Sequence, residues 1–270
     1  MAADCRRLRH NIIAMIHGAG SGHTGGSLSC VEILWTLYSQ ILRVRPREPA
    51  WPDRDRFVLS KGHAAPALYA VLATRGFFDP SELATLRRAG SSLQGHPDMK
   101  RTPGVDMSTG SLGMGISAGV GMALGARLAG KDFKVYVLVG DGELQEGQNW
   151  EALATARKFG LSSLVVIVDR NGVQLDGPTD EIMPMLDIPA KIAAFGLDVQ
   201  SCDGHDCRSL YESLRWAAAD DAAHGNSRVV VANTVKGKGV SFMEGESAWH
   251  GKPIGVEDYR LAKAELGGPD

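Results

Sequence analysis

A chain of 270 residues is long enough to bury a substantial hydrophobic core, as one large domain or as two small ones. Its composition is that of an ordinary globular protein, with 44% hydrophobic residues, 22% charged residues and a formal net charge of -2. Lysine and arginine are scattered along the sequence, so it lacks the basic patch that is typical of nucleic-acid-binding proteins. The longest apolar runs, such as Leu164–Val168, are far too short to span a bilayer, which argues against a membrane protein.

The N-terminus and the cysteines indicate a cytoplasmic protein with reduced thiols. Met1–Arg7 is charged but is not followed by the apolar segment and cleavage site of a secretory signal. Four cysteines at irregular spacing do not form a disulfide framework. Cys202, His205 and Cys207 offer soft-metal ligands within six residues, but no second Cys or His pair matches them. We therefore interpret Asp203-Gly204 as a turn that follows a strand.

The N-terminal half of the sequence alternates helical periodicity with glycine-containing loops. We predict helices over Leu8–Ile16, Leu28–Leu42, Ala64–Leu72 and Pro80–Arg88, a glycine-rich loop at 18–22 and a short strand at Arg56–Ser60. The segment Gly90–Gly115 is a long loop rich in glycine, proline and serine. Long loops inside compact domains are usually functional.

From Phe133 onward, buried strands alternate with helices, which is typical of a parallel sheet covered on both faces. The predicted strands are Lys134–Val139, Leu164–Asp169, Asp198–Ser201 and Arg228–Thr234, and the predicted helices are Gln148–Phe159, Pro184–Ala194 and Ser209–Ala219. This order predicts a doubly wound α/β fold. No linker or internal repeat divides the sequence, so we expect a single domain over residues 1–270.

The strongest local signal is Val-Gly-Asp-Gly-Glu-Leu-Gln-Glu-Gly at Val139–Gly147, where a buried strand ends and a helix begins. Ligands of open α/β sheets bind at the carboxyl ends of strands, and a helix N-terminus offers free amides to a phosphate. Gly140 and Gly142 let the backbone approach such a ligand closely. The carboxylate of Asp141 places a hard oxygen beside it, which indicates a divalent cation.

Asn171 strengthens this interpretation because it follows the next strand, about thirty residues later. Neighbouring parallel strands end close together, so its amide oxygen can share the cation with Asp141. Magnesium fits best, since it takes few protein oxygens at roughly 2.0–2.1 Å and completes its shell with phosphate and water. A single Gly-Asp-Gly is also a common turn sequence. The prediction of a cation site therefore depends on finding both this segment and Asn171.

Four histidines lie beside glycine in loops or at the ends of elements: His23, His63, His96 and His250. One such histidine is more often a surface or capping residue than a functional one. Four together favour shared proton-transfer work, which suits an imidazole with an unperturbed pKa of about 6.5. Lys236 and Lys238 lie in a glycine loop, where they either reach a phosphate or are simply solvated.

Gly-Asp-Gly with an asparagine about thirty residues later resembles the thiamine diphosphate motif, and Gly-Asp-Gly-Glu-Leu-Gln-Glu-Gly resembles transketolase specifically. Five further motifs match the cofactor-binding half of that family in order. They are Ser-Gly-His-Thr-Gly-Gly-Ser at Ser21, Ser-Lys-Gly-His-Ala at Ser60, Gln-Gly-His-Pro-Asp at Gln94, Ser-Thr-Gly-Ser-Leu-Gly-Met-Gly at Ser108 and Ala-Trp-His-Gly-Lys-Pro at Ala248. The resemblance covers nearly the whole chain and implies the thiamine diphosphate-binding fold.

The resemblance also implies a role for individual residues. It implies that His63 and His250 lie near the diphosphate and the donor sugar, that His96 contacts the donor hydroxyls, and that His23 assists proton transfer. It implies cofactor contacts from His63, Gly113, Gly140, Asp141, Gly142, Glu143, Asn171 and His250, with the backbone of Gly113 facing the aminopyrimidine. The carbonyl of Val173 is implied as a third protein ligand of Mg²⁺, or of Ca²⁺ or Mn²⁺ in its place, beside Asp141 and Asn171.

The implied activity is transfer of a two-carbon ketol unit from a ketose to an aldose, with sugars or sugar phosphates as substrates. A full transketolase continues into a second α/β domain, whereas this sequence ends at Asp270. The resemblance therefore implies a separate C-terminal subunit that carries the pyrimidine-binding domain, in an α2β2 heterotetramer. We expect Glu146 and an apolar face around Leu112, Met114 and Ile116 to lie at that interface.

Three other interpretations compete with this one. A deoxyxylulose-phosphate synthase-like or 2-oxo-acid dehydrogenase-like subunit is disfavoured by Leu144–Glu146 and by the loop histidines. A non-catalytic, cofactor-binding regulatory subunit stays open. Thr24 and Ser111 stand where the transketolase pattern commonly has proline, and the looser loops that result are expected to affect the choice of substrate.

Overall fold

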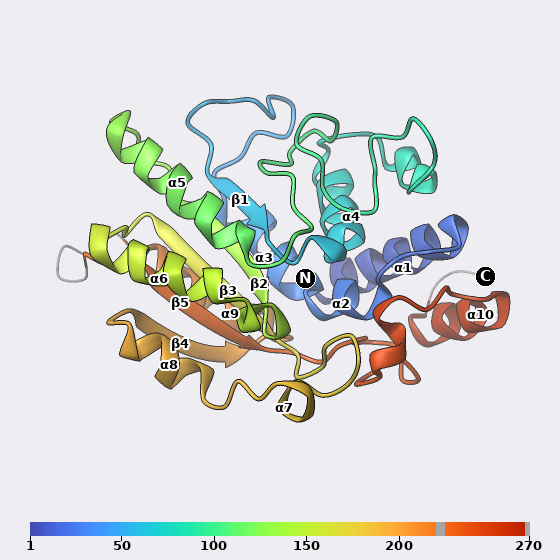
Figure 1. Ribbon diagram of the computed structural model, residues 1–270. Coiled ribbons are helices and arrows are strands. Elements are labelled where there is room, and N and C mark those ends of the chain that lie inside the picture. The colour runs from blue at the N-terminus through green and yellow to red at the C-terminus, as the bar shows by residue number, and fades with distance from the viewer. Residues whose placement is uncertain (220–224, 268–270) are drawn as a thin grey trace.

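A twisted five-stranded sheet crosses the molecule, with helices on both of its faces (Figure 1). The structure is a computed structural model that describes residues 1–219 and 225–267. All strand pairs are parallel and the order is β1-β2-β3-β5-β4. The strands are β1 (Arg56–Leu59), β2 (Val135–Gly140), β3 (Leu164–Arg170), β4 (Asp198–Asp203) and β5 (Arg228–Asn233). The predicted doubly wound α/β fold is confirmed.

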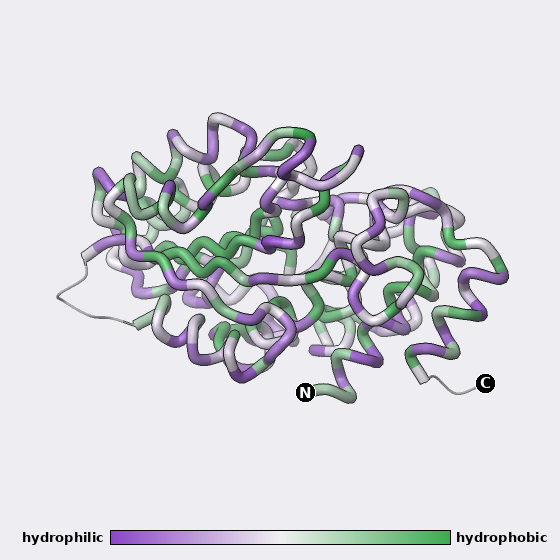
Figure 2. Tube along the Cα trace, turned by 90° about the horizontal axis from the view of Figure 1, so that it is seen from below, coloured by the Kyte–Doolittle hydropathy of each residue, from purple (hydrophilic) through white to green (hydrophobic). Residues whose placement is uncertain are grey.

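The central strands are buried on both faces because their side chains enter two different cores. In β2, Tyr136 and Leu138 enter one core, while Val135, Val137 and Val139 enter the other. This follows from the twofold alternation of side chains along a strand. Figure 2 shows the result as an apolar band along the strands in the middle of the molecule.

Each core is closed by its own set of helices. One face of the sheet packs against α5 (Met114–Leu128), α6 (Gly147–Phe159) and α8 (Ile188–Ala194). The other core is shared by α9 (Cys207–Ala218) and the N-terminal helices α1 (Ala2–Ala19), α2 (Thr24–Ser29), α3 (Val31–Thr36) and α4 (Ala65–Arg75). The remaining α-helices of the described residues are α7 (Thr179–Ile182) and α10 (Val256–Glu265). No helix in the described ranges combines the length and apolarity needed to cross a membrane.

Three predicted helices are interrupted, replaced by a 3₁₀ turn or shortened in the structure. The helix expected over Leu28–Leu42 is interrupted at Cys30, whose backbone (φ -103°, ψ 14°) leaves the helical region between α2 and α3. The helix expected over Pro80–Arg88 is only a 3₁₀ turn, η3 (Pro80–Thr85). The helix expected from Pro184 begins later, at Ile188, where the side chain of Asp187 caps it.

The helices α5 and α10 were not predicted from the sequence at all. The apolar interface face expected around Leu112, Met114 and Ile116 is wrong in one residue, because Ile116 is fully buried in the core. Leu112 and Met114 are exposed, as that prediction required. The apolar face therefore consists of side chains just before and at the start of α5, without Ile116.

Candidate active site

A cavity of about 250 Å³ opens at the edge of the sheet where β1, β2, β3 and β5 end. Open α/β sheets bind their ligands at this edge. The predicted residues that line it are His63, Gly140, Asp141, Gly142, Glu143, Asn171, Val173 and His250. The structure thus brings together most of the cofactor and metal residues expected from the sequence. Gly113 does not line the cavity, but its neighbour Leu112 does.

Asp141 joins the two loops that follow β2 and β3. Its buried carboxylate accepts hydrogen bonds from the backbone N–H of Gly172 at 2.6 Å and of Gly142 at 2.9 Å. Burial raises the pKa of this carboxyl to about 6, in spite of those two hydrogen bonds. A buried carboxylate whose hydrogen-bond partners are neutral amides would be stabilised by a nearby cation.

The oxygen donors beside Asp141 fit a hard divalent cation. The amide oxygen of Asn171 accepts a hydrogen bond from the N–H of Val173 at 3.2 Å, and the carbonyl of Val173 accepts one from Lys236 Nζ, also at 3.2 Å. Carboxylate, amide and carbonyl oxygens are the donor types that Mg²⁺ and Ca²⁺ take in proteins. The contact between Val173 and an ammonium group indicates that this carbonyl is placed to meet a positive charge.

Lys236 is buried in the wall of the cavity rather than solvated. Its ammonium group also donates to the carbonyl of Gln174 at 3.0 Å and lies 3.2 Å from Nδ1 of His250. Burial, with a smaller contribution from Lys61, lowers the pKa of Lys236 to about 8. The solvated alternative is therefore wrong for Lys236, whereas the half-exposed Lys238 forms an ion pair with Glu244 at 3.3 Å.

A buried ion pair beneath the cavity was not predicted from the sequence. Asp169 pairs with Lys61, and its carboxylate also accepts hydrogen bonds from the hydroxyls of Ser29 and Thr234. Burial alone would raise the pKa of Asp169, but the Lys61 ammonium holds it below its usual value. This network connects α2 with the ends of β1, β3 and β5. Lys61 lies in the Ser-Lys-Gly-His-Ala motif, which was the one signal that could have indicated it.

Glu143 ties together three loops around the cavity. Its buried carboxylate accepts hydrogen bonds from the Ser60 hydroxyl, from the N–H of Gly113 at 2.9 Å and from the N–H of Gly140 at 3.1 Å. Gly113 has φ +86°, a left-handed conformation that glycine adopts without strain. The hydrogen bond from Gly113 to Glu143 explains how the loop before α5 is fixed. The contact of Glu143 with a cofactor stays a prediction.

The four predicted histidines form one cluster beside the cavity. The ring centroid of His23 lies 5.3 Å from that of His250, 5.6 Å from that of His63 and 5.7 Å from that of His96. Burial, together with the surrounding positive charges, lowers the pKa of His23 and of His250 to about 4. The pKa values of His63 and His96 are lowered by the same causes. All four imidazoles are therefore neutral at pH 7, each with one donor and one acceptor nitrogen.

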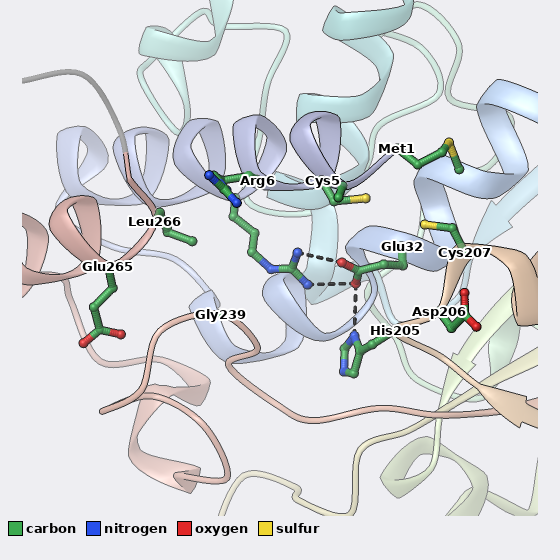
Figure 3. Close-up of a pocket in the computed structure, with 12 residues that line it drawn as sticks. Met1, Cys5, Arg6, Glu32, His205, Asp206, Cys207, Gly239, Glu265 and Leu266 are labelled. Carbon is green, nitrogen blue, oxygen red and sulfur yellow. Dashed lines mark hydrogen bonds and ion pairs between the residues drawn. The ribbon is translucent and has the colours of Figure 1, made fainter.

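A cluster of Arg9, Glu32 and His205 fixes the loop 235–238, which contains the buried Lys236. The cluster lines a second cavity of about 590 Å³, in which Figure 3 shows His205 beside Glu32. Glu32 accepts hydrogen bonds from Arg9 at 2.6 and 2.8 Å and from Nδ1 of His205 at 3.0 Å. The N–H of Val235 donates to Nε2 of His205 at 2.8 Å, and Arg9 Nε donates to the carbonyl of Lys238 at 2.8 Å. Both ends of the loop are thereby fixed.

The same cluster accounts for the Cys-Asp-Gly-His-Asp-Cys segment noted in the sequence. Both ring nitrogens of His205 are engaged, one by Glu32 and the other by the backbone of Val235. Neither is available to a metal ion without breaking a buried hydrogen bond. Cys202 and Cys207 are free thiols.

We expect Glu32→Gln to lower the free energy of unfolding by about 3–5 kcal/mol at pH 7, because it leaves Arg9 without its buried partner. Burial would raise the pKa of Glu32, but the hydrogen bonds from His205 and Arg9 outweigh it and lower the pKa to about 2 from an ordinary 4.5. The contribution of Glu32 is thus complete above pH 4.5 and is lost as the pH falls toward 2. Urea unfolding at pH 7 and pH 3 measures both effects.

The matched control for this prediction is Glu48→Gln, which removes an exposed carboxylate 3.2 Å from Arg45. An exposed pair of this kind contributes only about 0–1 kcal/mol. Equal losses in the two variants, or a Glu32→Gln effect of the same size at pH 7 and pH 3, would contradict the assignment.

Comparison with known proteins agrees with this geometry. Residues 2–269 match the family model described as transketolase, thiamine diphosphate binding domain. The chain is 46% identical over 247 residues to 6-deoxy-6-sulfo-D-fructose transketolase subunit SqwG of Clostridium sp. (strain MSTE9), covering 92% of this chain and 89% of that one. It is 41% identical to an apulose-4-phosphate transketolase subunit of Actinobacillus succinogenes, covering 97% and 94% of the two chains.

Among solved structures, transketolase from Campylobacter jejuni superimposes with a TM-score of 0.91 at 33% sequence identity. The match covers 99% of this chain but only 42% of that one, so this chain spans about two fifths of the full-length enzyme. The resemblance to the cofactor-binding half of transketolase and the expected thiamine diphosphate-binding fold are confirmed. The chain belongs to the transketolase family, as its thiamine diphosphate-binding domain.

Proposed function

We propose that this chain is the cofactor-binding subunit of a two-subunit transketolase, which moves a two-carbon ketol unit from a ketose to an aldose. The observation that carries the proposal is the cluster of four neutral imidazoles beside the cavity that contains Asp141 and Asn171. The cavity alone would suit any diphosphate held through a cation. Histidines in its wall and beside it add the donors and acceptors that a substrate with many hydroxyl groups requires.

The cavity residues fit the cofactor of this family. The carboxylate of Asp141, the amide oxygen of Asn171 and the carbonyl of Val173 would hold Mg²⁺, or Ca²⁺ or Mn²⁺ in its place. Lys236, whose ammonium contacts Val173, would supply positive charge to the diphosphate. When bound, thiamine diphosphate supplies the carbon nucleophile and the electron sink that ketol transfer requires. The protein residues hold the cofactor in place and exclude competing reactions.

The histidines would bind the donor sugar and move its protons. His63 and His250 line the cavity, which supports the proposal that they contact the sugar beside the cofactor. His96 is the most exposed of the four and lines a separate open pocket, which suits contact with the sugar hydroxyls. His23 lies between the others. A neutral imidazole can donate a proton from one nitrogen and accept one at the other, which is what proton transfer at a hydroxyl demands.

The proposed substrates and partner follow from the names of the relatives. Those names specify a sulfonated sugar and a phosphorylated sugar, and we propose that this enzyme also acts on sugars or sugar phosphates with an anionic end. Both relatives are named as subunits, and this chain spans most of each. The proposed partner is therefore a C-terminal transketolase subunit with the pyrimidine-binding domain, in an α2β2 assembly.

His96→Ala tests the proposed function. In the assembled enzyme we expect turnover to fall roughly 10²–10⁴-fold, as for a lost proton-transfer group, with thiamine diphosphate affinity unchanged because His96 does not line the cofactor cavity. Coupled steady-state assays measure turnover, and calorimetry measures cofactor binding. The matched control is His10→Ala on α1, where the imidazole lies 3.3 Å from the carbonyl of Leu266 and outside the two pockets that His63, His250 and His96 line.

Other results of the same assays would replace the proposal. Decarboxylation of a 2-oxo acid without ketol transfer would assign the chain to another class of thiamine diphosphate enzyme. Cofactor binding with no turnover of any donor would favour a regulatory subunit. Near wild-type turnover of His96→Ala would remove this histidine from the reaction.

A further inference from the structure

Arg87 has an unusual backbone conformation at the edge of the histidine cluster. Its φ of +60° is in the left-handed region, which residues other than glycine rarely adopt. Arg87 lies two residues after the end of η3, and its N–H donates to the carbonyl of Leu93 at 2.8 Å. Strained residues of this kind persist where the surrounding structure fixes them, often beside functional sites.

The strained backbone directs the guanidinium of Arg87 to His23. Its Nη1 donates to the Ser21 hydroxyl at 3.2 Å, and its Nη2 donates to Nδ1 of His23 at 3.4 Å. Gly95 leaves the room that this path requires, because a Cβ atom on Gly95 would lie 3.0 Å from both Nε and Nη2 of Arg87. The guanidinium is thus held between the loop that contains Ser21 and the loop that contains Gly95.

The chemistry of this contact determines which nitrogen of His23 carries the proton. A guanidinium group only donates hydrogen bonds and stays protonated, so Nδ1 of His23 must accept. The proton of the neutral imidazole is then on Nε2, on the opposite side of the ring. The groups that face His23 from the neighbouring elements are Arg87, Lys236 and the rings of the other three histidines.

We propose that Arg87 is a positioning residue of the donor site, which fixes His23 as its Nε2–H tautomer so that this imidazole donates a hydrogen bond to the sugar. The consequence for the sugar rests on the proposed function. The assignment of the tautomer does not rest on the proposed function, because it follows from the contact between Arg87 and His23 alone. Without the guanidinium, Nδ1 of His23 loses this donor, and the proton of the neutral ring can occupy either nitrogen.

The first test measures the tautomer in the full chain without any substrate. In a protein labelled with ¹⁵N-histidine, we expect wild-type His23 to show an unprotonated Nδ1 and a protonated Nε2. Arg87→Met should give a mixture of the two tautomers, and the pH at which His23 takes up a proton should rise from about 4 toward 6.5. Arg88→Met, which removes an exposed neighbouring arginine, is the control and should leave His23 unchanged.

Two further variants separate the contact from the fold. Arg87→Gly removes the side chain but suits the left-handed backbone, so it replaces Arg87→Met if that variant fails to fold. Gly95→Ala keeps the positive charge but pushes the guanidinium away from its position, and we expect it to shift the His23 signals in the same direction as Arg87→Met. A wild-type His23 tautomer in a folded Arg87→Gly protein would overturn the proposal.

The second test measures catalysis in the assembled enzyme. We expect Arg87→Met to lower kcat/KM for the ketose donor roughly 10–100-fold, the loss typical of a residue that orients a functional imidazole, with cofactor affinity retained. Unchanged kcat/KM would show that the tautomer of His23 does not matter for transfer and would overturn the role in the donor site. If the wild-type pair transfers no ketol group at all, the proposed function fails, while the NMR result still decides the contact between Arg87 and His23.

Discussion

Asp141→Ala is expected to weaken binding of thiamine diphosphate with Mg²⁺ by roughly 10²- to 4 × 10³-fold, the largest effect that we expect of a single substitution in the cavity. Loss of one partner from a buried charge pair costs about 3–5 kcal/mol, and each 1.4 kcal/mol changes affinity tenfold. Asp141 is the one of the three proposed cation ligands that brings a full negative charge. Its removal also breaks the link between the two loops, since it accepts hydrogen bonds from Gly142 and Gly172.

Isothermal calorimetry on the assembled enzyme, with Mg²⁺ and again with EDTA, measures this effect directly. The matched control is Asp176→Ala, which removes an exposed carboxylate from the same loop after β3. Wild-type cofactor affinity in Asp141→Ala would show that the cation is held by other groups. Binding that is equally tight in EDTA would show that no cation takes part.

The strands were predictable because their environment is simple. Strands of a parallel sheet are buried on both faces and therefore consist of continuous apolar residues, as in Leu164–Val168. The turns at their carboxyl ends contain the polar residues, so the positions of Asp141 and Asn171 followed from the same pattern. The predicted limits of β2 differ from the observed ones by one residue at each end, and those of β3 by one residue at the C-terminal end.

The missed helix α5 shows where local sequence is insufficient. It contains four glycines among fifteen residues, which lowers its intrinsic helix propensity. Two of these glycines lie where the helix meets its neighbours: a Cβ on Gly115 would approach Ser60 Oγ to 2.2 Å, and one on Gly119 would approach Val137 Cγ2 to 2.5 Å. Tertiary packing therefore selects glycine here and stabilises a helix that the residues alone do not favour.

The predicted helix over Pro80–Arg88 was wrong for a related reason, which is that a tertiary contact overrides the local pattern. Its apolar periodicity is sound, but the backbone of Arg87 is left-handed, and a residue with φ +60° cannot continue a right-handed helix. The contact that accompanies this conformation joins Arg87 to His23, 64 residues away in the sequence. Nothing in the local pattern carries that information.

The same limit applies to the polar residues of the site. The four histidines and the Asp141–Asn171 pair could be proposed because each has a glycine-rich context in the sequence. Lys61 and Asp169 could not be proposed, because the ion pair that they form joins residues 108 positions apart in the sequence. Their burial depends on the sheet being assembled, and a lysine in sequence is far more often solvated.

The chain alone is expected to show no ketol transfer and to become active only with a C-terminal transketolase subunit. Apolar side chains stand exposed at the cavity: Leu112 and Leu175 line it and are 39% and 59% exposed, and Met114 beside them is 49% exposed. Grouped exposed apolar residues of this kind are typical of a surface that another protein covers. Two relatives of similar length are named as subunits, which is consistent with such a partner.

The acids of this chain explain why a partner is needed. In this cofactor class, activation requires a carboxylic acid hydrogen-bonded to the aminopyrimidine, and the resemblance assigns that acid to the second α/β domain. Among the described residues that line the cavity, the acids are Asp141, Glu143 and Glu146. Asp141 is a proposed ligand of the cation, and the carboxylate of Glu143 accepts hydrogen bonds from Ser60 and two backbone amides. Glu146 is exposed, and because it follows Gly-Asp-Gly so closely we expect that it does not reach the aminopyrimidine ring.

The experiment compares ketol transfer by the purified chain with that of the chain co-expressed with its second subunit, and light scattering measures the expected α2β2 mass. Met114→Asp should weaken assembly and lower activity at limiting partner concentration, while Val256→Asp on α10, a substitution at an even more exposed apolar residue, should change neither. Saturating partner should restore turnover in Met114→Asp, because the substitution acts on association and leaves the histidines in place. Robust turnover by the lone chain would mean that its own residues activate the cofactor, and Glu146 would then be the first acid to substitute.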